Sequence, residues 1–114
     1  MSQTDIVRIE NSMKAAEKTT ELGEALARLR SNRDFKRIVL EGYFKDEAVR
    51  LVQAKALPNL QSGASQADLI RQIDAIGSLQ EYFRTVDYMA DQARKELVSG
   101  QQEIEEILRE GDEA

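Results

Sequence analysis

Apolar residues recur at every seventh position along the C-terminal half of the chain. Two series, three positions apart, are Leu69, Ile76, Phe83, Ala90, Leu97 and Ile104, and Gln72, Leu79, Val86, Ala93, Gly100 and Ile107. A heptad pattern kept over about five repeats is typical of a helix packed in the manner of a coiled coil. It predicts one helix from Gln66 to about Arg109, roughly 65 Å long. A break at Ser99-Gly100 stays open, because a central glycine costs about 1 kcal/mol relative to alanine.

The residues before this helix predict where it begins. Ser65-Gln66-Ala67-Asp68 is similar to a capping box, with Asp in place of the usual Glu or Gln. The polar stretch 59–65 contains Ser62-Gly63 and is typical of a loop. Pro58 prevents an earlier helix from simply continuing into that loop.

The N-terminal part also has helical periodicity, and it predicts a helix from Asp5 to Ser31. Apolar residues on one face are Ile6, Ile9, Met13 and Ala16, followed after a weaker stretch by Leu22, Ala25, Leu26 and Leu29. Either Ser2 or Thr4 could cap this helix. Asp5 would then lie in the first turn, where a negative charge interacts favourably with the helix dipole.

Two short helices are predicted between the long ones. Asn32 is a suitable N-cap for the first, which carries Phe35, Ile38 and Val39 and ends at Gly42. The second covers about Lys45 to Ala56, with Phe44, Ala48, Leu51 and Val52 on one face. We therefore expect an all-α fold: a long helical hairpin, made by the N-terminal helix and the heptad helix, with two short helices between. Residues 1–109 would form a single helical domain, and residues 110–114 an acidic frayed tail.

Two kinds of contact could cover the heptad seam. The hairpin could pack on itself, or the seam could form a coiled coil between chains, and the two are compatible if the hairpin leaves one face uncovered. Tyr43 and Tyr82 could serve as interface anchors or lie at the edge of the core. The candidate interface residues are Leu69, Ile76, Leu79, Phe83, Val86, Leu97, Tyr43 and Tyr82.

Composition argues against most catalytic chemistry. The 114 residues include no cysteine and no histidine, which excludes disulfides, Cys/His zinc sites, thiol nucleophiles and imidazole bases. The glycines are isolated and form no phosphate loop. Acidic pairs such as Asp46/Glu47 and Glu105/Glu106 lie in hydrophilic stretches, as solvated helix surfaces do. We expect a protein that is not an enzyme, with no catalytic residue, no metal, no cofactor and no small-molecule substrate.

Charge is unevenly distributed along a chain whose net charge is −5. Residues 99–114 hold one basic and six acidic side chains, which disfavours nucleic-acid binding there. One basic cluster could contact an anion or nucleic acid, or could pair with acidic side chains beside a helix turn. Its members are Arg28, Arg30, Arg33, Lys36 and Arg37. No apolar run reaches the length of a membrane span, and residues 1–5 lack the features of a signal peptide, so we expect a soluble protein inside the cell.

Several segments resemble a small family of tailed-bacteriophage and prophage proteins over roughly residues 29–90. In order, they are residues 34–44 (DFKRIVLEGYF), 47–52 (EAVRLV), 58–61 (PNLQ), 72–77 (QIDAIG) and 82–85 (YFRT). The resemblance implies a gene near virion structural genes but no catalytic residues. Gly42 and Gly77 lie in these segments, where we expect a tight turn or the close approach of a neighbouring helix.

The resemblance implies a virion structural or assembly accessory protein, located in the host cytoplasm or in the virion. Its partners would be further copies of the chain or a phage structural protein, without a membrane and without nucleic acid. The alternative is a regulator that binds a host protein or nucleic acid through the basic cluster, residues 28–37.

Overall fold

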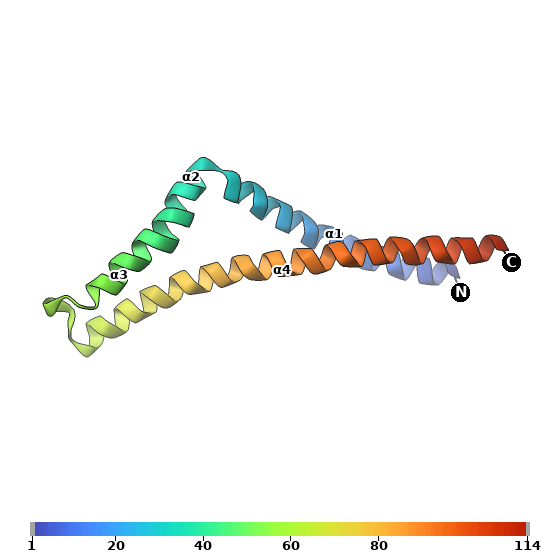
Figure 1. Ribbon diagram of the computed structural model, residues 1–114. Helices are drawn as coiled ribbons and strands as arrows, with labels where there is room; N and C mark the ends of the chain where they lie inside the picture. The colour runs from blue at the N-terminus through green and yellow to red at the C-terminus, as the bar shows by residue number, and fades with distance from the viewer. Residues whose placement is uncertain (1, 114) are drawn as a thin grey trace. The chain divides into compact units, whose positions relative to one another are not determined.

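The computed structural model describes residues 2–113, which are mostly helical and include no β-strand (Figure 1). The all-α class is confirmed, with a long N-terminal helix, a long C-terminal helix and shorter helices between. The elements are α1 (Ser2–Ser31), α2 (Arg33–Phe35), the π-helix η1 (Lys36–Glu47), α3 (Ala48–Ala54), the 3₁₀-helix η2 (Pro58–Leu60) and α4 (Gly63–Glu113).

The described residues form two compact units. We call residues 2–25 with 86–113 the helix-pair unit, and residues 26–85 the middle unit. Each unit contains a part of both long helices. The expectation of one domain over residues 1–109 stays a prediction, as does fraying of the tail, where α4 continues to Glu113.

The helix-pair unit consists of two antiparallel helices, with the start of α1 beside the end of α4 (Figure 1). Small residues bring the two helices close together. A Cβ added at Gly23 would lie 2.3 Å from the Cβ of Ala90, and one added at Gly100 would lie 2.9 Å from Met13 Sδ. The buried residues of this unit are Ala16, Gly23, Val86, Ala90, Ala93 and Gly100.

The middle unit is built around one apolar cluster. Its buried members are Leu51, Ala54, Leu69 and Ile76, and five partly buried residues pack against them: Tyr43, Phe44, Ala48, Leu60 and Ile73. Phe83 extends this cluster, because its ring centroid lies 6.0 Å from that of Phe35 and 5.7 Å from that of Phe44. Residues from α2, η1, α3 and α4 thus share one core.

The heptad seam is the inner face of α4 in both units. Every member of the two series is buried or half-buried except Gln72. α4 runs through Ser99-Gly100 without a break. The contact of Gly100 with Met13 and Ile9 explains why glycine is tolerated there, since packing between the helices offsets its low helix propensity.

The expected end of a helix at Gly42 is wrong. α2, η1 and α3 follow one another without a gap from Arg33 to Ala54, and Gly42 lies inside η1. No described glycine has a positive φ. A Cβ at position 42 would lie 3.0 Å from the carbonyl oxygen of Arg37, five residues earlier, so glycine here relieves crowding within a π-helical turn.

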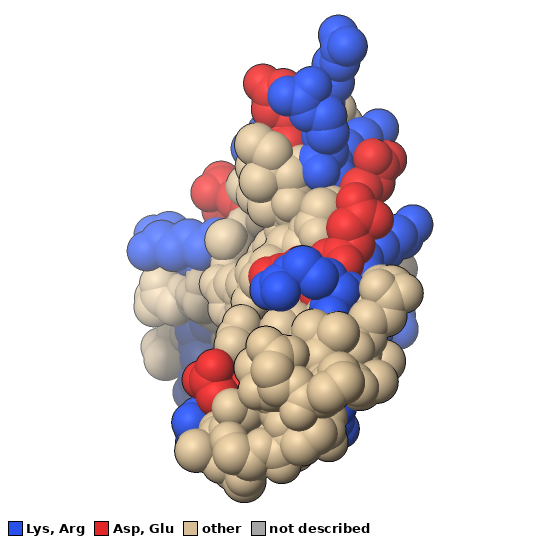
Figure 2. Space-filling model, turned by 90° about the vertical axis from the view of Figure 1, so that its left-hand side faces the viewer, with Lys and Arg blue, Asp and Glu red and all other residues tan. Residues whose placement is uncertain are grey.

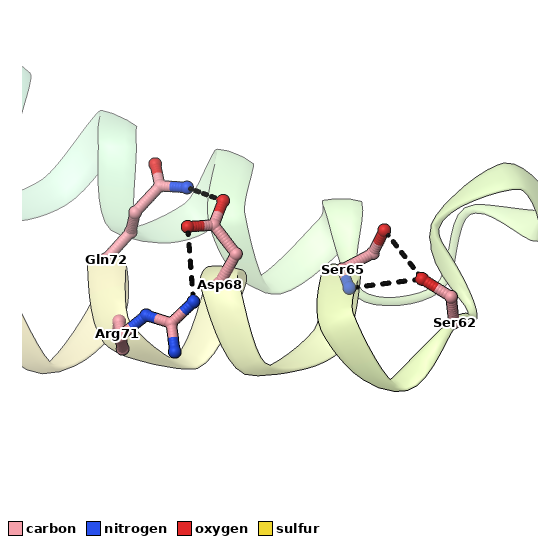
Figure 3. Close-up of polar contacts among 5 residues, drawn as sticks. All are labelled: Ser62, Ser65, Asp68, Arg71 and Gln72. Atoms are coloured by element: carbon pink, nitrogen blue, oxygen red, sulfur yellow. Dashed lines mark hydrogen bonds and ion pairs between the residues drawn. The ribbon is translucent and has the colours of Figure 1, made fainter.

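α4 begins earlier than the capping box predicted, because Ser62 caps it instead of Ser65. The backbone N–H of Ser65 donates to Ser62 Oγ at 3.1 Å, and the Ser62 hydroxyl donates to Ser65 Oγ at 2.9 Å (Figure 3). Asp68 takes no part in the cap. It accepts a hydrogen bond from Gln72 at 2.9 Å and lies 3.8 Å from Arg71 (Figure 3).

Of the other predicted caps, Asn32 is confirmed and Thr4 is wrong. Asn32 caps α2 as expected, since its Oδ1 accepts the backbone N–H of Phe35 at 2.9 Å. α1 already begins at Ser2, so Thr4 lies within the helix and is not its cap. The side chain of Ser2 lies outside the described part of the chain. Asp5 is in the first turn of α1 as predicted.

Two glutamine side chains close the turn between α3 and α4. Gln61 Nε2 donates to the carbonyl oxygens of Lys55 at 2.8 Å and Leu57 at 2.7 Å. Gln66 Nε2 donates to those of Lys55 at 3.1 Å and Leu60 at 2.8 Å. The Lys55 and Leu60 carbonyls lie at the ends of α3 and η2, where a helix leaves carbonyl groups without partners of its own. The Leu57 carbonyl also accepts the backbone N–H of Leu60 at 3.1 Å.

Candidate interaction surfaces

Most of the predicted interface residues pack within the chain. Leu69, Ile76 and Val86 are buried, while Leu79, Phe83, Leu97 and Tyr43 are half-buried. Tyr82 alone among the eight is exposed, at 56%, with its ring centroid 6.2 Å from that of Phe83. This placement favours the hairpin that packs on itself as the explanation of the seam, and it leaves Tyr82 as the accessible anchor.

The basic cluster lies in the middle unit, and most of it is free of ion pairs. Within residues 2–113, no acidic side chain pairs with Arg28, Arg33, Lys36 or Arg37, and all four are exposed. The guanidinium of Arg30 lies 5.9 Å from the Phe83 ring centroid, within the range of a cation–π interaction. The expected pairing with acidic side chains is therefore absent for four of the five cations.

Figure 2 views the side of the molecule on which the α3–α4 turn lies. Basic side chains gather at its upper end, where α2 lies in Figure 1, with acidic side chains beside them. The lower part is largely uncharged, in agreement with the sequence, since residues 56–67 contain no charged side chain.

The middle unit also has a shallow hollow along η1 and the start of α3. Its volume is about 530 Å³, and it lies over Gly42 between Ile38 and Tyr43. Glu47 and Arg50 form an ion pair at its edge, with a second hydrogen bond of 3.0 Å from Arg50 Nη2 to Glu47 Oε2. Hydrogen bonding to Arg50 lowers the pKa of the Glu47 carboxyl, and the same contact raises the pKa of Arg50.

The helix-pair unit exposes large apolar side chains away from its seam. They are Val7, Leu22, Tyr88, Met89, Val98 and Leu108. The heptad series did not identify them, because none occupies a seam position. The sequence feature that could have indicated an exposed apolar surface is Tyr88-Met89, an apolar pair directly before Ala90 of the seam.

A groove opens along one flank of the helix pair. We call it the flank groove; its volume is about 610 Å³. Apolar or small residues line it, namely Ile9, Ser12, Met13, Ser99, Gly100 and Ile107, together with the charged Asp5, Arg8, Glu96 and Glu103. Arg8 and Asp5 lie 3.9 Å apart, at the limit of an ion pair, and both are exposed to solvent to a large extent.

A second hollow of about 240 Å³ adjoins the flank groove, since Glu96 lines both. On α1 it is lined by the small side chains of Ala15, Ala16 and Thr19. On α4 it is lined by Tyr88, Met89, Gln92, Ala93 and Glu96. The two hollows therefore make one side of the helix pair concave over several helical turns.

The two units carry charge of opposite sign. Residues 2–25 and 86–113 hold six basic and fourteen acidic side chains, a net charge of −8. Residues 26–85 hold ten basic and seven acidic side chains, a net charge of +3. The flank groove thus belongs to a strongly acidic unit, and the basic cluster to a cationic one.

Neither a cluster of metal ligands nor a membrane-spanning helix occurs among the described residues. No group of three or more acidic side chains among them converges as metal ligands would. Within the same residues, no helix combines the length and the apolar character needed to cross a bilayer. Comparisons of the chain with protein families, with curated proteins and with solved structures found no match.

Proposed function

We propose that the chain is a non-enzymatic helical interaction protein, a structural or assembly accessory of a tailed phage. It would act by packing helices against further copies or against a phage structural protein. One observation carries this proposal: the helix-pair unit buries mainly Ala and Gly, while six larger apolar side chains remain in solvent. A partner that covers this unit would complete its core.

The small apolar area buried between the two helices supports a partner protein. Most of the stability of a helix in a protein comes from tertiary packing, and two helices that meet through alanine and glycine bury little apolar area. Full burial of a Leu, Met or Val side chain contributes roughly 1.5–3 kcal/mol, and covering the exposed half of one of these residues contributes about half of that. An interface over Leu22, Tyr88 and Met89 alone would therefore add several such contributions to a thin core.

Association can be tested by light scattering after size exclusion and by sedimentation over a wide concentration range. We expect the wild-type chain to associate with further copies or with an added virion protein, and replacement of Tyr88 and Met89 by glutamine to weaken that association. Replacement of the polar, exposed Gln101 by alanine is the control, because it lies on the same helix outside the flank groove and the hollow that adjoins it, and removes no apolar area. A strictly monomeric chain that binds no virion protein would contradict the proposal.

The phage context needs its own measurement. Mass spectrometry of purified virions would show the chain if it is packaged, and affinity capture from infected cells would show a structural protein beside it if it acts only during assembly. Its absence from both would leave a helical interaction protein with no place in a phage particle.

The basic cluster supports a second function, a regulator that binds a host protein or nucleic acid. The supporting observation is that Arg28, Arg33, Lys36 and Arg37 are exposed without ion pairs in the described chain. Reversing the charge of Arg33 and Arg37 should abolish binding to duplex DNA, and binding should fall steeply with salt if phosphates are contacted. Unchanged or absent binding would remove nucleic acid as the target of this function.

A further inference from the structure

We infer that the flank groove receives a cationic, amphipathic α-helix from a partner protein. This inference rests on the proposed function and deepens it, since it assigns a surface and a partner chemistry. The groove is the concave side of the helix pair, about 610 Å³ in volume and extended by a second hollow of about 240 Å³. An α-helix that lays an apolar face into such a groove is a common mode of recognition.

The floor of the groove suits an apolar helix face. Ile9, Met13 and Ile107 contribute half-buried apolar side chains, and Gly100 leaves a gap that Met13 enters. Methionine adapts its shape to different partners more readily than branched side chains do. Three or four large apolar residues of an incoming helix, spaced by three and four positions, would meet this floor.

The walls of the groove allow a helix to come close. Ser12 of α1 and Ser99 of α4 line the first hollow, and Ala15 and Thr19 continue the wall on α1 in the second. None of these side chains is large. Over the first hollow a third helix can therefore approach at the roughly 8–10 Å interaxial distance of close helix packing. Over the second hollow, Tyr88 and Met89 of α4 occupy part of that space.

The acidic residues around the groove favour a partner helix that carries basic side chains. The rim carries Asp5, Glu96 and Glu103 against a single cation, Arg8, which itself lies beside Asp5. The unit as a whole has a net charge of −8. Lysine or arginine on the flanks of an incoming helix would meet this acidic rim favourably and steer the encounter.

The same charge argues against the helix-pair unit of a second copy in this groove. Two helix-pair units would bring net charges of −8 together, and like charges across an interface oppose association. A partner helix that is basic on its polar side lacks this penalty. The occupant we assign is therefore a basic helix of another protein.

The test uses the full chain and a synthetic helix as the probe. The probe has about 18 residues, leucine at the i, i+3, i+4 and i+7 positions of one face and lysine elsewhere; a scrambled peptide of the same composition spreads the leucines around the helix. Fluorescence anisotropy at low and moderate salt gives the affinities. We expect the amphipathic probe to bind about tenfold more tightly than the scrambled peptide, because only the former presents an apolar face.

Two matched double variants locate the binding. Glu96→Lys with Glu103→Lys changes the rim, and Glu105→Lys with Asp112→Lys makes the same charge change on α4 at exposed positions that do not line the groove. The rim variant should weaken the probe about tenfold or more, and the control variant less than about threefold. Helicity measured by circular dichroism checks that both variants are folded.

Several results would overturn the inference. They are equal binding of the scrambled peptide, equal weakening by both double variants, no binding of the probe below about 1 mM, and a dimer that only the rim variant alters. In the last case the groove holds a second copy. If the chain still associates or enters virions while the probe fails, the inference falls and the proposed function stands.

Discussion

Gly23 of α1 faces Ala90 of α4 so closely that a Cβ at position 23 would lie 2.3 Å from the Ala90 Cβ. Two atoms in those positions overlap, and neither Cβ can rotate away. The helices of the helix-pair unit are therefore held at a separation that only glycine permits at this point. Gly77, where the close approach of a helix was expected, has no atom within 4 Å of an added Cβ, so that expectation is wrong.

Gly23→Ala should destabilise the chain by about 1–3 kcal/mol, because the helices must move apart to accept the added methyl group. Gly77→Ala is the matched control and should stabilise by up to about 1 kcal/mol, since it improves helix propensity in open space. Denaturant unfolding followed by circular dichroism measures both. A Gly23→Ala variant as stable as Gly77→Ala would show that α1 and α4 do not meet here.

Leu51→Ala should destabilise by about 2–5 kcal/mol, the range for a leucine removed from a packed core. Leu51 is 1% exposed and lies at the centre of the middle-unit core. The neighbouring Val52 is 59% exposed, so Val52→Ala should change the free energy of unfolding by about 0.5 kcal/mol or less. Similar effects of the two substitutions in chemical unfolding would place the core elsewhere.

Ser62→Ala should cost about 1 kcal/mol, because it removes the side chain that accepts the Ser65 N–H at the start of α4. Ser65→Ala keeps the hydrogen bond from the backbone N–H of residue 65 to Ser62, so it should lower the stability less. Thermal unfolding of both variants gives the order. If Ser65→Ala proves the more damaging, the cap predicted from the residues is the correct one and α4 begins later.

Thr20→Val should stabilise the chain by about 1 kcal/mol. The Thr20 hydroxyl is buried and has no hydrogen-bond partner, so its burial is penalised, whereas a methyl group of similar size would not be. Thr19 is the control, since its hydroxyl donates to the Ala15 carbonyl at 3.2 Å and Thr19→Val gives up that bond. Equal stabilities of the two variants would mean that the Thr20 hydroxyl has a partner in solution.

The Glu47 carboxyl should titrate below its ordinary pKa, because Arg50 stabilises its charged form. A lowered pKa in the folded state gives stability that is present above the ordinary pKa and is lost as the pH falls through the lowered value. NMR titration of the Glu47 side chain would measure this. Arg50→Gln should return the pKa toward its ordinary value, and no change on that substitution would remove the assigned cause.

The periodic spacing of apolar residues along the sequence was the most informative guide to the fold. The seven-residue spacing from Leu69 to Ile107 predicted the inner face of α4, because burial on one side of a helix demands that spacing whatever covers it. Asn32 was recognised as a cap because a cap side chain acts only on N–H groups two or three positions further along, here that of Phe35. A local signal such as this cap and a periodic signal such as the heptad spacing can be recognised without knowing how the helices pack in the fold.

Features that depend on which helix of the chain packs against which could not be predicted in the same way. Gly77 and Gly23 are equally isolated in the sequence, and only the register of α1 against α4 decides which of them meets another helix. Gly42 is as suitable for a helix end as for a π-helical turn. The exposed Tyr88 and Met89 and the flank groove follow from the tilt and spacing of two helices, which no heptad pattern specifies.

The π-helix η1 gives the middle unit a tolerance to chain length that its α-helices lack. In a π-helical turn each N–H bonds to the carbonyl five residues earlier instead of four, so the turn holds one residue more than an α-helical turn. Deleting one residue between Lys36 and Glu47 would be absorbed by a change of that turn to α-helix, and Leu51 and Ala54 would stay on the side of the helix that Phe44 shares. The same deletion inside α3 has no wider turn to absorb it, and it would rotate every later side chain by about 100°.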